Sequence, residues 1–432
     1  MRILVLGINY WPDLTGIAPF TTGRCEYLAA RGHEVTVCTG VPYYPEWRIA
    51  DGYRGRLWSR EQRNGVTILR NWLYVPQQVT SLQRIFHEAS FFALSLQRIM
   101  FRRRPDLLMV ISPPLALGLT GALISRTWRI PYVFHVEDVQ PDAAADLGML
   151  ANRRILKFLY AIERLSYRRA ALVSTLTEAM RRRIAAKGID DGKVKIFAPW
   201  AQPELFAVPS TRKDGLFRRR YGLEGRFIAL HSGNIGVKQG LDVVLHAARH
   251  TAAQDQIVYL IVGDGAMRGR LEAQAGTMGL SNVRFMNILP SDEYLELLAA
   301  ADLCLLTQQR TVSDFVFPSK VVSALAAGRP LVASANPDSE VVNVVRQADA
   351  GFVVPAEDPA ALAQAVGTLC RDEALRASRG AQGRAYAHRH WNRDRILPIM
   401  EAQLLEVRGA NGSGGGRRAT LTAGTVPASS EL

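Results

Sequence analysis

Residues 315–333 read FVFPSKVVSALAAGRPLVA, and their types and spacing could bind an anion at the start of a helix. Pro318 suits the first position of a helix because its missing N–H is not needed there, and Gly328 suits the end. Free backbone N–H groups, the Ser319 hydroxyl and the Lys320 ammonium would then face whatever lies before the helix. A phosphate is the natural occupant of such a site. Taken alone, the segment would favour an ordinary helix of an α/β domain.

Three glycine-bearing turns follow apolar runs of strand length, where open α/β sheets bind their ligands. They lie at 9–16, 231–242 and 262–267. Glycine lets the backbone approach a ligand closely, and Lys238 adds a mobile charge for a phosphate. None has the Gly-x-Gly-x-x-Gly pattern of dinucleotide sites, which disfavours a nicotinamide cofactor. Each turn alone could simply connect a strand to a helix, but together with the helix start they favour a nucleotide diphosphate site.

The segment YVFHVEDVQP at 132–141 carries titratable side chains at the end of a predicted strand. Strand alternation puts His135 and Glu137 on one face and Asp138 on the other, until the strand ends. His135 could equally be a hydrogen-bonded core histidine. Asp138, beside a loop that ends in Pro141, is the stronger candidate for the mouth of an active site.

Aromatic side chains gather after the second predicted strand, at Tyr43, Tyr44, Trp47 and Tyr53. Aromatic faces pack against the C–H faces of sugars, so this loop could bind a saccharide. Plain loop packing explains the cluster nearly as well. The role of Arg70 is open in the same way.

Strand-like and helix-like segments alternate along the chain, which predicts parallel strands covered by helices. The predicted strands are 2–8, 34–39, 66–70, 107–112, 132–136, 171–176 and 194–198, then 227–233, 257–263, 283–288, 303–307, 331–335 and 351–354. Residues 200–212 carry two prolines and no clear period, which predicts a linker. We therefore expect an α/β fold of two Rossmann-like domains with an interdomain cleft.

The chain has 432 residues, too many for one compact core, and 48% of them are hydrophobic, as in globular proteins. Residues 1–209 hold 28 Lys and Arg against 17 Asp and Glu, and carry most of the formal net charge of +14. This excess of positive charge predicts an anionic partner: nucleic acid, a phospholipid surface or a phosphorylated substrate.

Four scattered cysteines favour reduced thiols in a cytoplasm. No apolar run approaches the roughly 20 residues of a membrane span.

Taken jointly, these motifs resemble the retaining glycosyltransferase family 4 with the GT-B fold. The resemblance is greatest to bacterial exopolysaccharide and O-antigen enzymes, including the colanic acid type. It covers roughly residues 1–408 through the segments GINYWPD at 7–13, VPYYPEW at 41–47, DVQPD at 138–142, SGNIGVKQG at 232–240, VGDG at 262–265 and PSK…AGRP at 318–330. It implies an acceptor-binding domain at 1–205, a donor-binding domain at 206–390 and a helix at 391–408 that crosses back to the first domain. We expect a disordered tail at 409–432.

The resemblance also implies a UDP- or GDP-linked sugar as co-substrate, without a cofactor or a metal ion. Its donor-binding residues would be Gly233, Asn234 and Lys238 at the diphosphate, Gly263 and Gly265 at the nucleoside, Ser319 and Lys320 at phosphate or sugar, and Gly16, Phe317 and Ser323 around them. The catalytic residues would be His135, Glu137 and Asp138, and the acceptor-binding residues Tyr43, Tyr44, Trp47 and Arg70. The donor phosphate would take the acceptor proton, so the protein mainly positions groups and stabilises charge.

Two glutamates that the family usually carries eight residues apart are replaced here by Phe315 and Ser323. A serine hydroxyl can bond a ribose but is a weaker acceptor than a carboxylate. Asn234 stands at the usual arginine and Gln239 at the usual lysine, with Lys238 one residue earlier. These replacements indicate either a subtype or a catalytically impaired regulator that binds nucleotide sugars. A nucleotide-sugar epimerase of the same double-Rossmann plan is a further alternative, and a nucleic-acid binder ranks low.

Helical segments at 82–104 and 152–169 combine apolar residues with arginines. Such segments can lie in a membrane interface and be attracted to anionic lipid. Alternatively, their apolar residues face the core and the arginines are simply solvated. We expect an enzyme that acts on a polyprenyl-diphosphate-linked or oligosaccharide acceptor, cytoplasmic and peripherally bound to the inner face of the plasma membrane.

Overall fold

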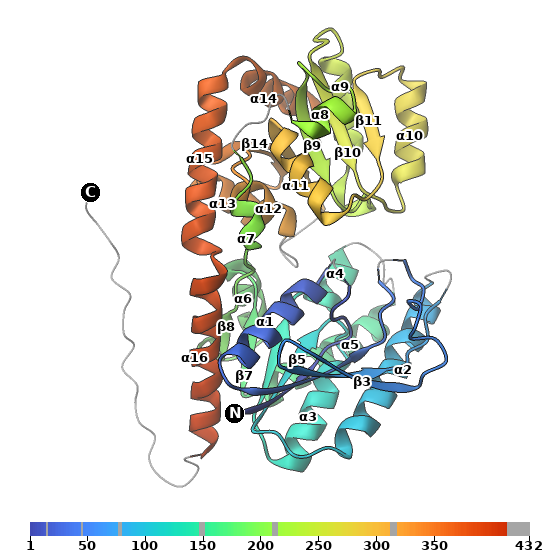
Figure 1. The fold of residues 1–432 in the computed structure, drawn as a ribbon, viewed down its shortest axis with the longest axis vertical. Coiled ribbons are helices and arrows are strands. Elements are labelled where there is room, and N and C mark those ends of the chain that lie inside the picture. Colours follow the sequence, from blue (N-terminus) through green and yellow to red (C-terminus); the bar gives the residue numbers. More distant parts are fainter. Residues whose placement is uncertain are drawn as a thin grey trace, which may run out of the picture.

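The computed structural model of the chain describes residues 1–13, 16–44, 46–76, 80–146, 152–209, 215–311 and 318–412. Two α/β domains lie one above the other, and the last long helices run along one side of both (Figure 1). Each domain has its own sheet. The predicted architecture of two α/β domains is therefore confirmed.

The N-terminal domain is built on an eight-stranded sheet with the order β3-β4-β2-β1-β5-β6-β7-β8. Its strands are β1 (Arg2–Leu6), β2 (Glu34–Gly40), β3 (Trp58–Arg63), β4 (Val66–Asn71), β5 (Leu107–Ser112), β6 (Tyr132–Val136), β7 (Leu172–Thr175) and β8 (Val194–Ile196). All neighbours are parallel except β3, which pairs antiparallel with β4. The sequence analysis missed β3 because its residues, WSREQR, are polar edge residues without an apolar face. The Asn64-Gly65 turn that joins it to β4 has positive φ at both positions, as tight hairpins require.

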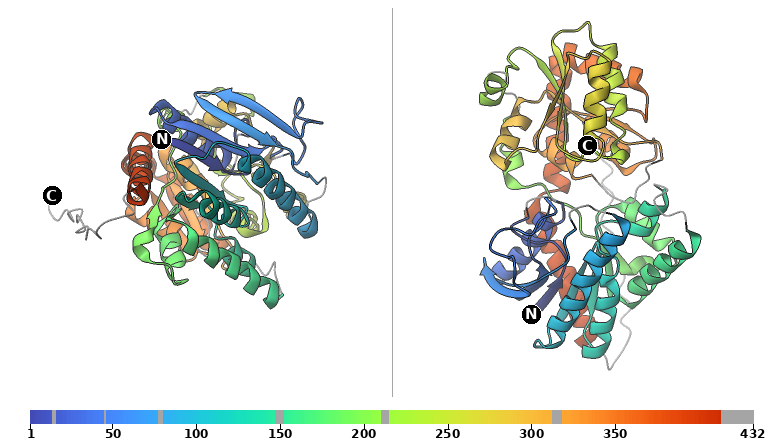
Figure 2. Two further views of the ribbon diagram at one scale, coloured as in Figure 1. Left: turned by 90° about the horizontal axis from the view of Figure 1, so that it is seen from below. Right: turned by 90° about the vertical axis from the view of Figure 1, so that its right-hand side faces the viewer.

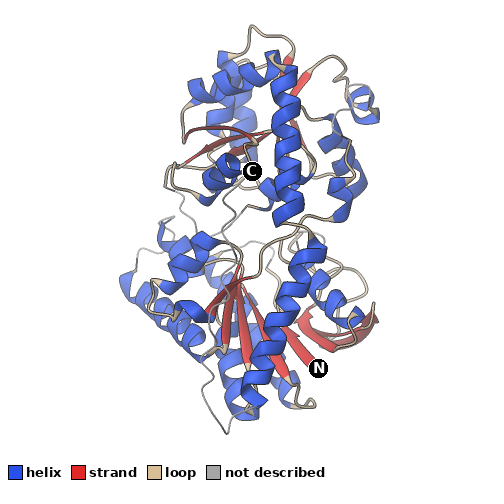
Figure 3. Ribbon diagram, turned by 90° about the vertical axis from the view of Figure 1, so that its left-hand side faces the viewer, coloured by secondary structure: helices blue, strands red, loops and turns tan. Residues whose placement is uncertain are grey.

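Helices cover both faces of this sheet (Figure 3). They are α1 (Ala18–Ala30), α2 (Ser81–Met100), α3 (Leu117–Trp128), α4 (Gln140–Asp146), α5 (Arg153–Arg169) and α6 (Glu178–Ala185). A capping box between Thr80 and Gln83 begins α2, and Asn152 caps α5. On one face α3 packs between α2 and α5 (Figure 2), and α1 lies on the other face. No helix in the described part of the chain combines the length and the apolar character needed to cross a membrane.

The C-terminal domain has a six-stranded parallel sheet with the order β11-β10-β9-β12-β13-β14. Its strands are β9 (Phe227–Ser232), β10 (Ile257–Val262), β11 (Val283–Met286), β12 (Leu303–Thr307), β13 (Leu331–Ala335) and β14 (Gly351–Pro355). Its helices are α8 (Leu216–Arg220), α9 (Asp242–His250), α10 (Arg268–Thr277), α11 (Ser291–Ala300), α12 (Ser319–Ala326), α13 (Glu340–Gln347) and α14 (Pro359–Arg371). The strand order reverses at β9, so the carboxyl ends of β9 and β12 frame the usual ligand position of such a sheet.

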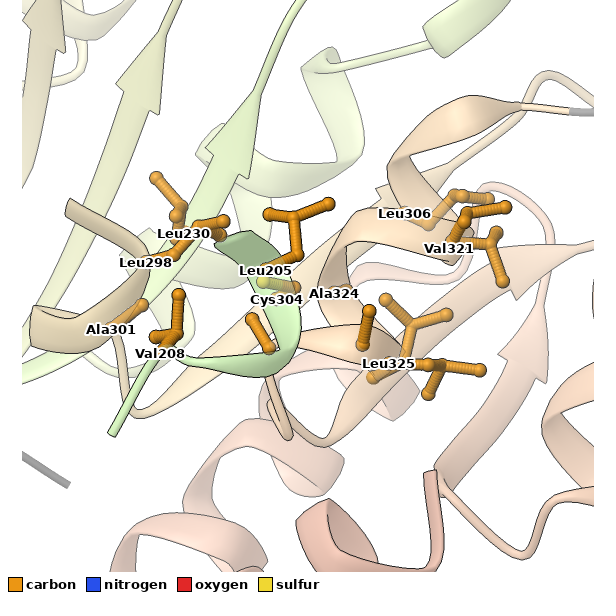
Figure 4. Packing of buried hydrophobic residues seen from close by; sticks show 14 of the residues in the cluster. Leu205, Val208, Leu230, Leu298, Ala301, Cys304, Leu306, Val321, Ala324 and Leu325 are labelled. Carbon is orange, nitrogen blue, oxygen red and sulfur yellow. The ribbon is translucent and has the colours of Figure 1, made fainter. Parts of the chain in front are cut away.

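The predicted linker at 200–212 contains a short helix, α7 (Pro203–Phe206). Pro203 begins the helix, and Leu205 and Val208 pack with Leu230 and Leu298 in the C-terminal core (Figure 4). The expectation of an irregular linker is therefore wrong for residues 203–206. Burial of its apolar side chains makes this segment part of the second domain.

The chain returns to the first domain through α15 (Glu373–His390) and α16 (Arg393–Gly412). Leu397, Met400 and Leu404 of α16 are buried in the N-terminal core, in a cluster that includes Leu28 of α1. Helical spacing of these apolar residues puts them on one face. Residues 409–412, expected to be part of the tail, are helical, because α16 continues past its last buried turn. The rest of the expected tail, 413–432, lies outside the described residues.

Candidate functional site

A cavity of about 680 Å³ lies between the two domains. Its N-terminal wall includes Asp13, Tyr43, Tyr44, Glu46, Arg48 and Asp51, and its C-terminal wall includes Ser232, Gly233, Val262, Gly263, Ser291 and Tyr294. The size is within the range of cavities that enclose small ligands. The cavity combines an aromatic and acidic wall with a wall of exposed backbone.

The glycine turns after β9 and β10 lie directly against each other. The amide of Gly233 donates to the carbonyl of Val262 at 2.8 Å, and φ is +117° at Gly233 and +148° at Gly263. A Cβ added to Gly263 would lie 1.9 Å from the carbonyl oxygen of Gly233. A Cβ on Gly265 would lie 2.5 Å from the carbonyl oxygen of Ile235. Only glycine fits at these positions, so bare backbone of Gly233 and Gly263 reaches the cavity.

Lys320, near the start of α12, lies across the glycine turn that follows β9. A Cβ on Gly233 would lie 2.8 Å from its Cε, and its Nζ is 3.1 Å from Nε2 of His231. Burial lowers the pKa of Lys320 to about 8. The ammonium can only donate, so Nε2 of His231 accepts. The sequence analysis gave His231 no role, and its place directly before the turn was the signal that could have found it.

The other donor-binding candidates of the C-terminal domain have contacts of their own. Ser319 begins α12, and the Ser323 hydroxyl donates to the carbonyl of Ser319 at 3.3 Å. Asn234 lies beside Gly265, whose added Cβ would be 2.7 Å from Oδ1 of Asn234. Phe317 lies outside the described residues, as does Phe315.

His135 and Glu137 contact each other, as strand alternation predicted, but neither lines the cavity. Nε2 of His135 is 3.1 Å from Oε1 of Glu137, which also accepts from Nη1 of Arg24 at 2.7 Å. Nδ1 of His135 is 2.9 Å from Oγ of Ser174. His135 is 0% exposed, so the structure gives it the surroundings of a core histidine.

The ionisation of this buried pair follows from Arg24. Burial, and then the charge of Arg24, lower the pKa of His135 to about 4. Burial alone would raise the pKa of Glu137, but Arg24 and His135 together hold it at about 2. At neutral pH the pair is a neutral imidazole beside an ionised carboxylate. The sequence analysis missed Arg24 because nothing in its local pattern marks it.

Asp138 follows the pair at the carboxyl end of β6. Burial raises its pKa to about 6, while Lys238 of the other domain and Arg84 act to lower it. Its Oδ1 is buried and accepts no hydrogen bond from any described residue. Lys238 lies in the short helix η2 (Val237–Gln239), where its carbonyl accepts from the amide of Gln309 at 2.9 Å. The structure therefore brings charged candidates of the two domains into one electrostatic environment.

The aromatic candidates Tyr43, Tyr44 and Trp47 lie together, and Gly16 lies beside Tyr44. Tyr43 and Tyr44 line the cavity, and a Cβ on Gly16 would lie 3.7 Å from Cε1 of Tyr44. Trp47 packs edge-on against Tyr43, with ring centroids 5.5 Å apart. The buried His87, which the sequence analysis missed, is 3.0 Å from the Tyr43 hydroxyl and 2.6 Å from a backbone carbonyl. Tyr43 is thus held in place rather than free to turn.

Arg70 is not brought to the cavity. It is fully buried, its Nε lies 2.9 Å from Oε1 of Glu61, and its Nη2 donates to the carbonyl of Trp11 at 2.5 Å. The expectation that Arg70 contacts an acceptor is wrong for this arrangement, because Arg70 is buried and antiparallel β3 supplies Glu61 as its ion-pair partner. Arg70 instead supports the loop that carries Asp13.

Asp13 is a cavity residue that the sequence analysis left without a role. It lines the N-terminal wall, and burial raises its pKa to about 6 against the opposing effects of Asn9 and Arg70. Nδ2 of Asn9 donates to its Oδ2 at 3.2 Å. Its place at the end of the GINYWPD segment was the available signal. Among the described residues, no three His, Cys, Asp or Glu side chains are grouped as metal ligands.

Comparison with known families assigns both halves of the chain. A glycosyl transferase 4-like domain model matches residues 15–200, and a glycosyl transferases group 1 model matches residues 226–372. The putative colanic acid biosynthesis glycosyl transferase WcaI of Escherichia coli (strain K12) is 32% identical over 403 residues. That match covers 92% of this chain and 98% of the relative. The probable glycosyltransferase WbjE of Pseudomonas aeruginosa is 26% identical, covering 65% of this chain and 70% of the relative.

Solved structures share the fold. Anabaena Alr3699/HepE, in complex with UDP, has a TM-score of 0.66 at 19% identity and covers 94% of this chain and 100% of that one. WaaG, a glycosyltransferase involved in lipopolysaccharide biosynthesis, has a TM-score of 0.64 at 18% identity, covering 96% and 100%. At such identities the likeness concerns the fold alone.

Proposed function

Because this chain belongs to the GT-B glycosyltransferases, with a glycosyl transferase 4-like domain followed by a group 1 domain, we propose that it is a retaining enzyme of polysaccharide biosynthesis. It transfers a sugar from a UDP- or GDP-linked donor to a polyprenyl-diphosphate-linked or oligosaccharide acceptor. Its relative WcaI is named for colanic acid biosynthesis, which supports an exopolysaccharide product. HepE has been solved with UDP-glucose, which supports a nucleotide-sugar donor.

The observation that carries this proposal is Lys320 lying across the bare backbone of Gly233. Among the described residues, no carboxylate is paired with this buried ammonium, whose pKa is lowered by burial, and a diphosphate would supply the counter-charge. The start of α12 adds backbone N–H groups to the same anion site. The donor diphosphate therefore binds between α12 and the two glycine turns.

In the proposed reaction the bond from the anomeric carbon to the diphosphate oxygen breaks, and a bond to the acceptor oxygen forms on the same face of the sugar. The acceptor proton passes to the departing diphosphate. Lys320 and Lys238 stabilise the charge that develops on that diphosphate, in place of a metal ion. Asp138, at the cleft end of β6, orients the acceptor hydroxyl. Activity should therefore persist in EDTA, and its loss there would overturn the metal-free mechanism.

Calorimetry with UDP and GDP, with UMP and GMP as controls for the second phosphate, tests the donor site. The protein should bind one nucleoside diphosphate more tightly than the corresponding monophosphate, and transfer of radiolabelled sugar then tests the reaction.

Ser323, in place of a family glutamate, favours one alternative, a regulator that binds donor without turnover. Binding without transfer or hydrolysis of any donor would support that regulator. Donor conversion without an acceptor would support an epimerase.

A lipid-linked acceptor is supported by exposed apolar side chains at the cleft ends of two helices. Leu82, Ile85 and Phe86 are exposed in the first turns of α2, and Ile155 and Phe158 in the first turns of α5. Both helices begin at the carboxyl-end side of the sheet, where the cavity lies. Basic residues interleave them: Arg84, Arg153, Arg154 and Lys157. Apolar anchors with basic neighbours fit an anionic membrane surface on the cytoplasmic side.

Vesicle sedimentation tests this membrane surface. The protein should bind vesicles that contain phosphatidylglycerol and not pure phosphatidylcholine, because the attraction is partly electrostatic. The double variant Phe86→Ser/Phe158→Ser should lose binding. Leu216→Ser, at an equally exposed leucine of the C-terminal domain, is the matched control and should bind like the wild type. Equal binding to both vesicles, or to neither, would contradict the proposal.

A further inference from the structure

Two aromatic residues at the exit from the N-terminal domain pack on the two partners of the buried Glu137, which are His135 and Arg24. Phe197 stacks on His135, with ring centroids 5.7 Å apart and an interplanar angle of 26°. The guanidinium of Arg24 lies over the indole of Trp200, with Cζ of Arg24 5.2 Å from the centroid of the Trp200 ring. The segment that leaves the first domain therefore contacts both partners of Glu137.

Trp200 is held tightly against α1. A Cβ on Gly23 would lie 2.8 Å from Cζ2 of Trp200, and Phe20 meets the indole edge-on at 5.1 Å. The indole is buried. A close-packed side chain of this kind transmits a displacement, because there is no free space into which it could relax.

The chain passes between the domains twice, once after Trp200 and once between α15 and α16, and these two segments contact each other beside Trp200. The amide of Ala201, next to Trp200, donates to the carbonyl of Trp391 at 2.9 Å, and Ala201 forms a parallel bridge with Asn392. Nη2 of Arg393 lies 3.5 Å from the carbonyl of Gly23. A change in the angle between the domains must therefore act on the junction of Trp200 with α1.

Arg24 links this junction to Glu137. It is 1% exposed, and its Nη1 donates to Glu137, but its Nε and Nη2 are buried and bond to no described acceptor. Buried donors without acceptors are costly, and each one in a native structure calls for an explanation. The Trp200 ring offers the guanidinium a cation–π contact that offsets part of this cost. The position of Arg24 therefore depends on where Trp200 lies.

We infer that Trp200 and Arg24 are positioning residues that couple the arrangement of the two domains to Asp138. Arg24 holds Glu137, and Glu137 immediately precedes Asp138, so a shift of Trp200 moves the carboxylate that faces Lys238. Asp138 is correctly placed only while the crossing segment keeps its indole on the guanidinium. The coupling itself does not depend on the proposed function. Only its expected effect on turnover rests on that function.

Hydrogen exchange measured by mass spectrometry on the ligand-free full chain tests the coupling without any substrate. Trp200→Leu should raise the exchange of peptides covering 132–138 by about tenfold or more, and Glu137→Gln should do the same for 197–203. Trp200→Phe keeps an aromatic face and should restore most of the protection. Phe217→Leu is the matched control, because that ring is buried in the C-terminal domain against Tyr221, and it should leave 132–138 unchanged. Unchanged exchange in Trp200→Leu, or an equal rise in Phe217→Leu, overturns the coupling.

A kinetic measurement separates positioning from general stability. Trp200→Leu and Arg24→Lys should bind UDP as tightly as the wild type, while turnover of the donor identified above falls about tenfold or more, because small misplacements of reacting groups are costly. Equal loss of UDP affinity and turnover would overturn the positioning role. Absence of turnover in the wild type would overturn the proposed function. The hydrogen-exchange measurement would still test the coupling of Trp200 to residues 132–138, because it needs no substrate.

Discussion

Nζ of Lys320 lies 3.1 Å from Nε2 of His231, where the start of α12 meets the glycine turn after β9. The ammonium and the imidazole come from elements 89 residues apart in the chain. Burial keeps the pKa of His231 well below its ordinary value, so the imidazole stays neutral and available as an acceptor. The pair therefore holds one positive charge beside the bare backbone of Gly233.

UDP affinity should fall as the pH rises through about 8. The pKa of Lys320 is lowered to about 8, and only its protonated form attracts the diphosphate. Binding of an anion raises this pKa, so binding takes up a proton and weakens by up to about tenfold per pH unit above 8. Calorimetry between pH 7 and 9.5 measures the slope.

Two variants at the same position provide the controls. Lys320→Ala should weaken UDP binding at pH 7 and leave the fold intact by circular dichroism. Lys320→Arg keeps its charge throughout this range and should abolish the slope. Unchanged UDP affinity in Lys320→Ala would remove the residue from the donor site.

Asp138→Asn should remove the acidic limb of the rate profile. Burial raises the pKa of Asp138 to about 6, so the wild type gains its carboxylate, and its activity, as the pH rises through about 6. An amide of the same shape has no such titration and orients the acceptor hydroxyl less well, so it should lower kcat by about a hundredfold at pH 7. A wild-type limb that survives in the variant would show that another group titrates there.

Gly263→Ala should destabilise the C-terminal domain by about 2 kcal/mol or more, because its Cβ would meet the Gly233 carbonyl at 1.9 Å and φ is +148°. Thermal unfolding and UDP affinity should fall together. Gly269→Ala, in α10 with no atom within 4 Å of the added Cβ, is the control. It should stabilise by about 0.5–1 kcal/mol. Wild-type stability in Gly263→Ala would show that the turn can adopt another conformation.

Glu401→Gln should loosen α16 from the first domain. Glu401 accepts from Tyr27 Oη at 2.9 Å and Arg31 Nε at 3.2 Å, and its Oε1 lies 2.9 Å from Nε2 of His33. Hydrogen bonds to a charged group contribute about 1.5–3 kcal/mol, so a loss of that order is expected in denaturant unfolding. Glu406→Gln, at an exposed site of the same helix, should change nothing.

The pH dependence of this contact has a definite sign. Burial alone would raise the pKa of Glu401, but its donors Tyr27, His33 and Arg31 lower it below the ordinary value. Its contribution is therefore present above the pKa of the unfolded chain, near 4.5, and is lost as the pH falls through the folded pKa. The stability difference between wild type and Glu401→Gln should shrink below pH 4.5. A constant difference would contradict the assignment.

Most strands could be predicted because parallel strands buried on both faces are continuous apolar runs. The predicted strand 132–136 matches β6 (Tyr132–Val136), and 331–335 matches β13. The edge strand β3 has no such run, and its identity depends on pairing with β4. The helix in the predicted linker was missed for a related reason, since four residues are too few to show a period.

The glycine turns and the helix start at Ser319 were visible in the sequence because backbone geometry restricts which residues can occupy them. Burial and long-range partners were not visible. The sequence alone could not show that His135 is fully buried between Ser174 and Glu137, because those contacts depend on the folded structure. Arg70 was misassigned because its partner Glu61 lies on the strand that the pattern did not predict.

The sequence by itself determined two α/β domains and the local chemistry of each turn, since these depend on residues close together in the chain. Only the tertiary structure decided which turns face one another: Gly233 against Gly263, Lys320 over both the turn and His231, and Trp200 on Arg24. Those contacts arise from strand order and domain packing, and neither leaves a periodic signal in the chain. The bare backbone of Gly233 and Gly263 therefore becomes part of an interdomain cavity, and Lys320 comes to lie across Gly233, only in the folded protein.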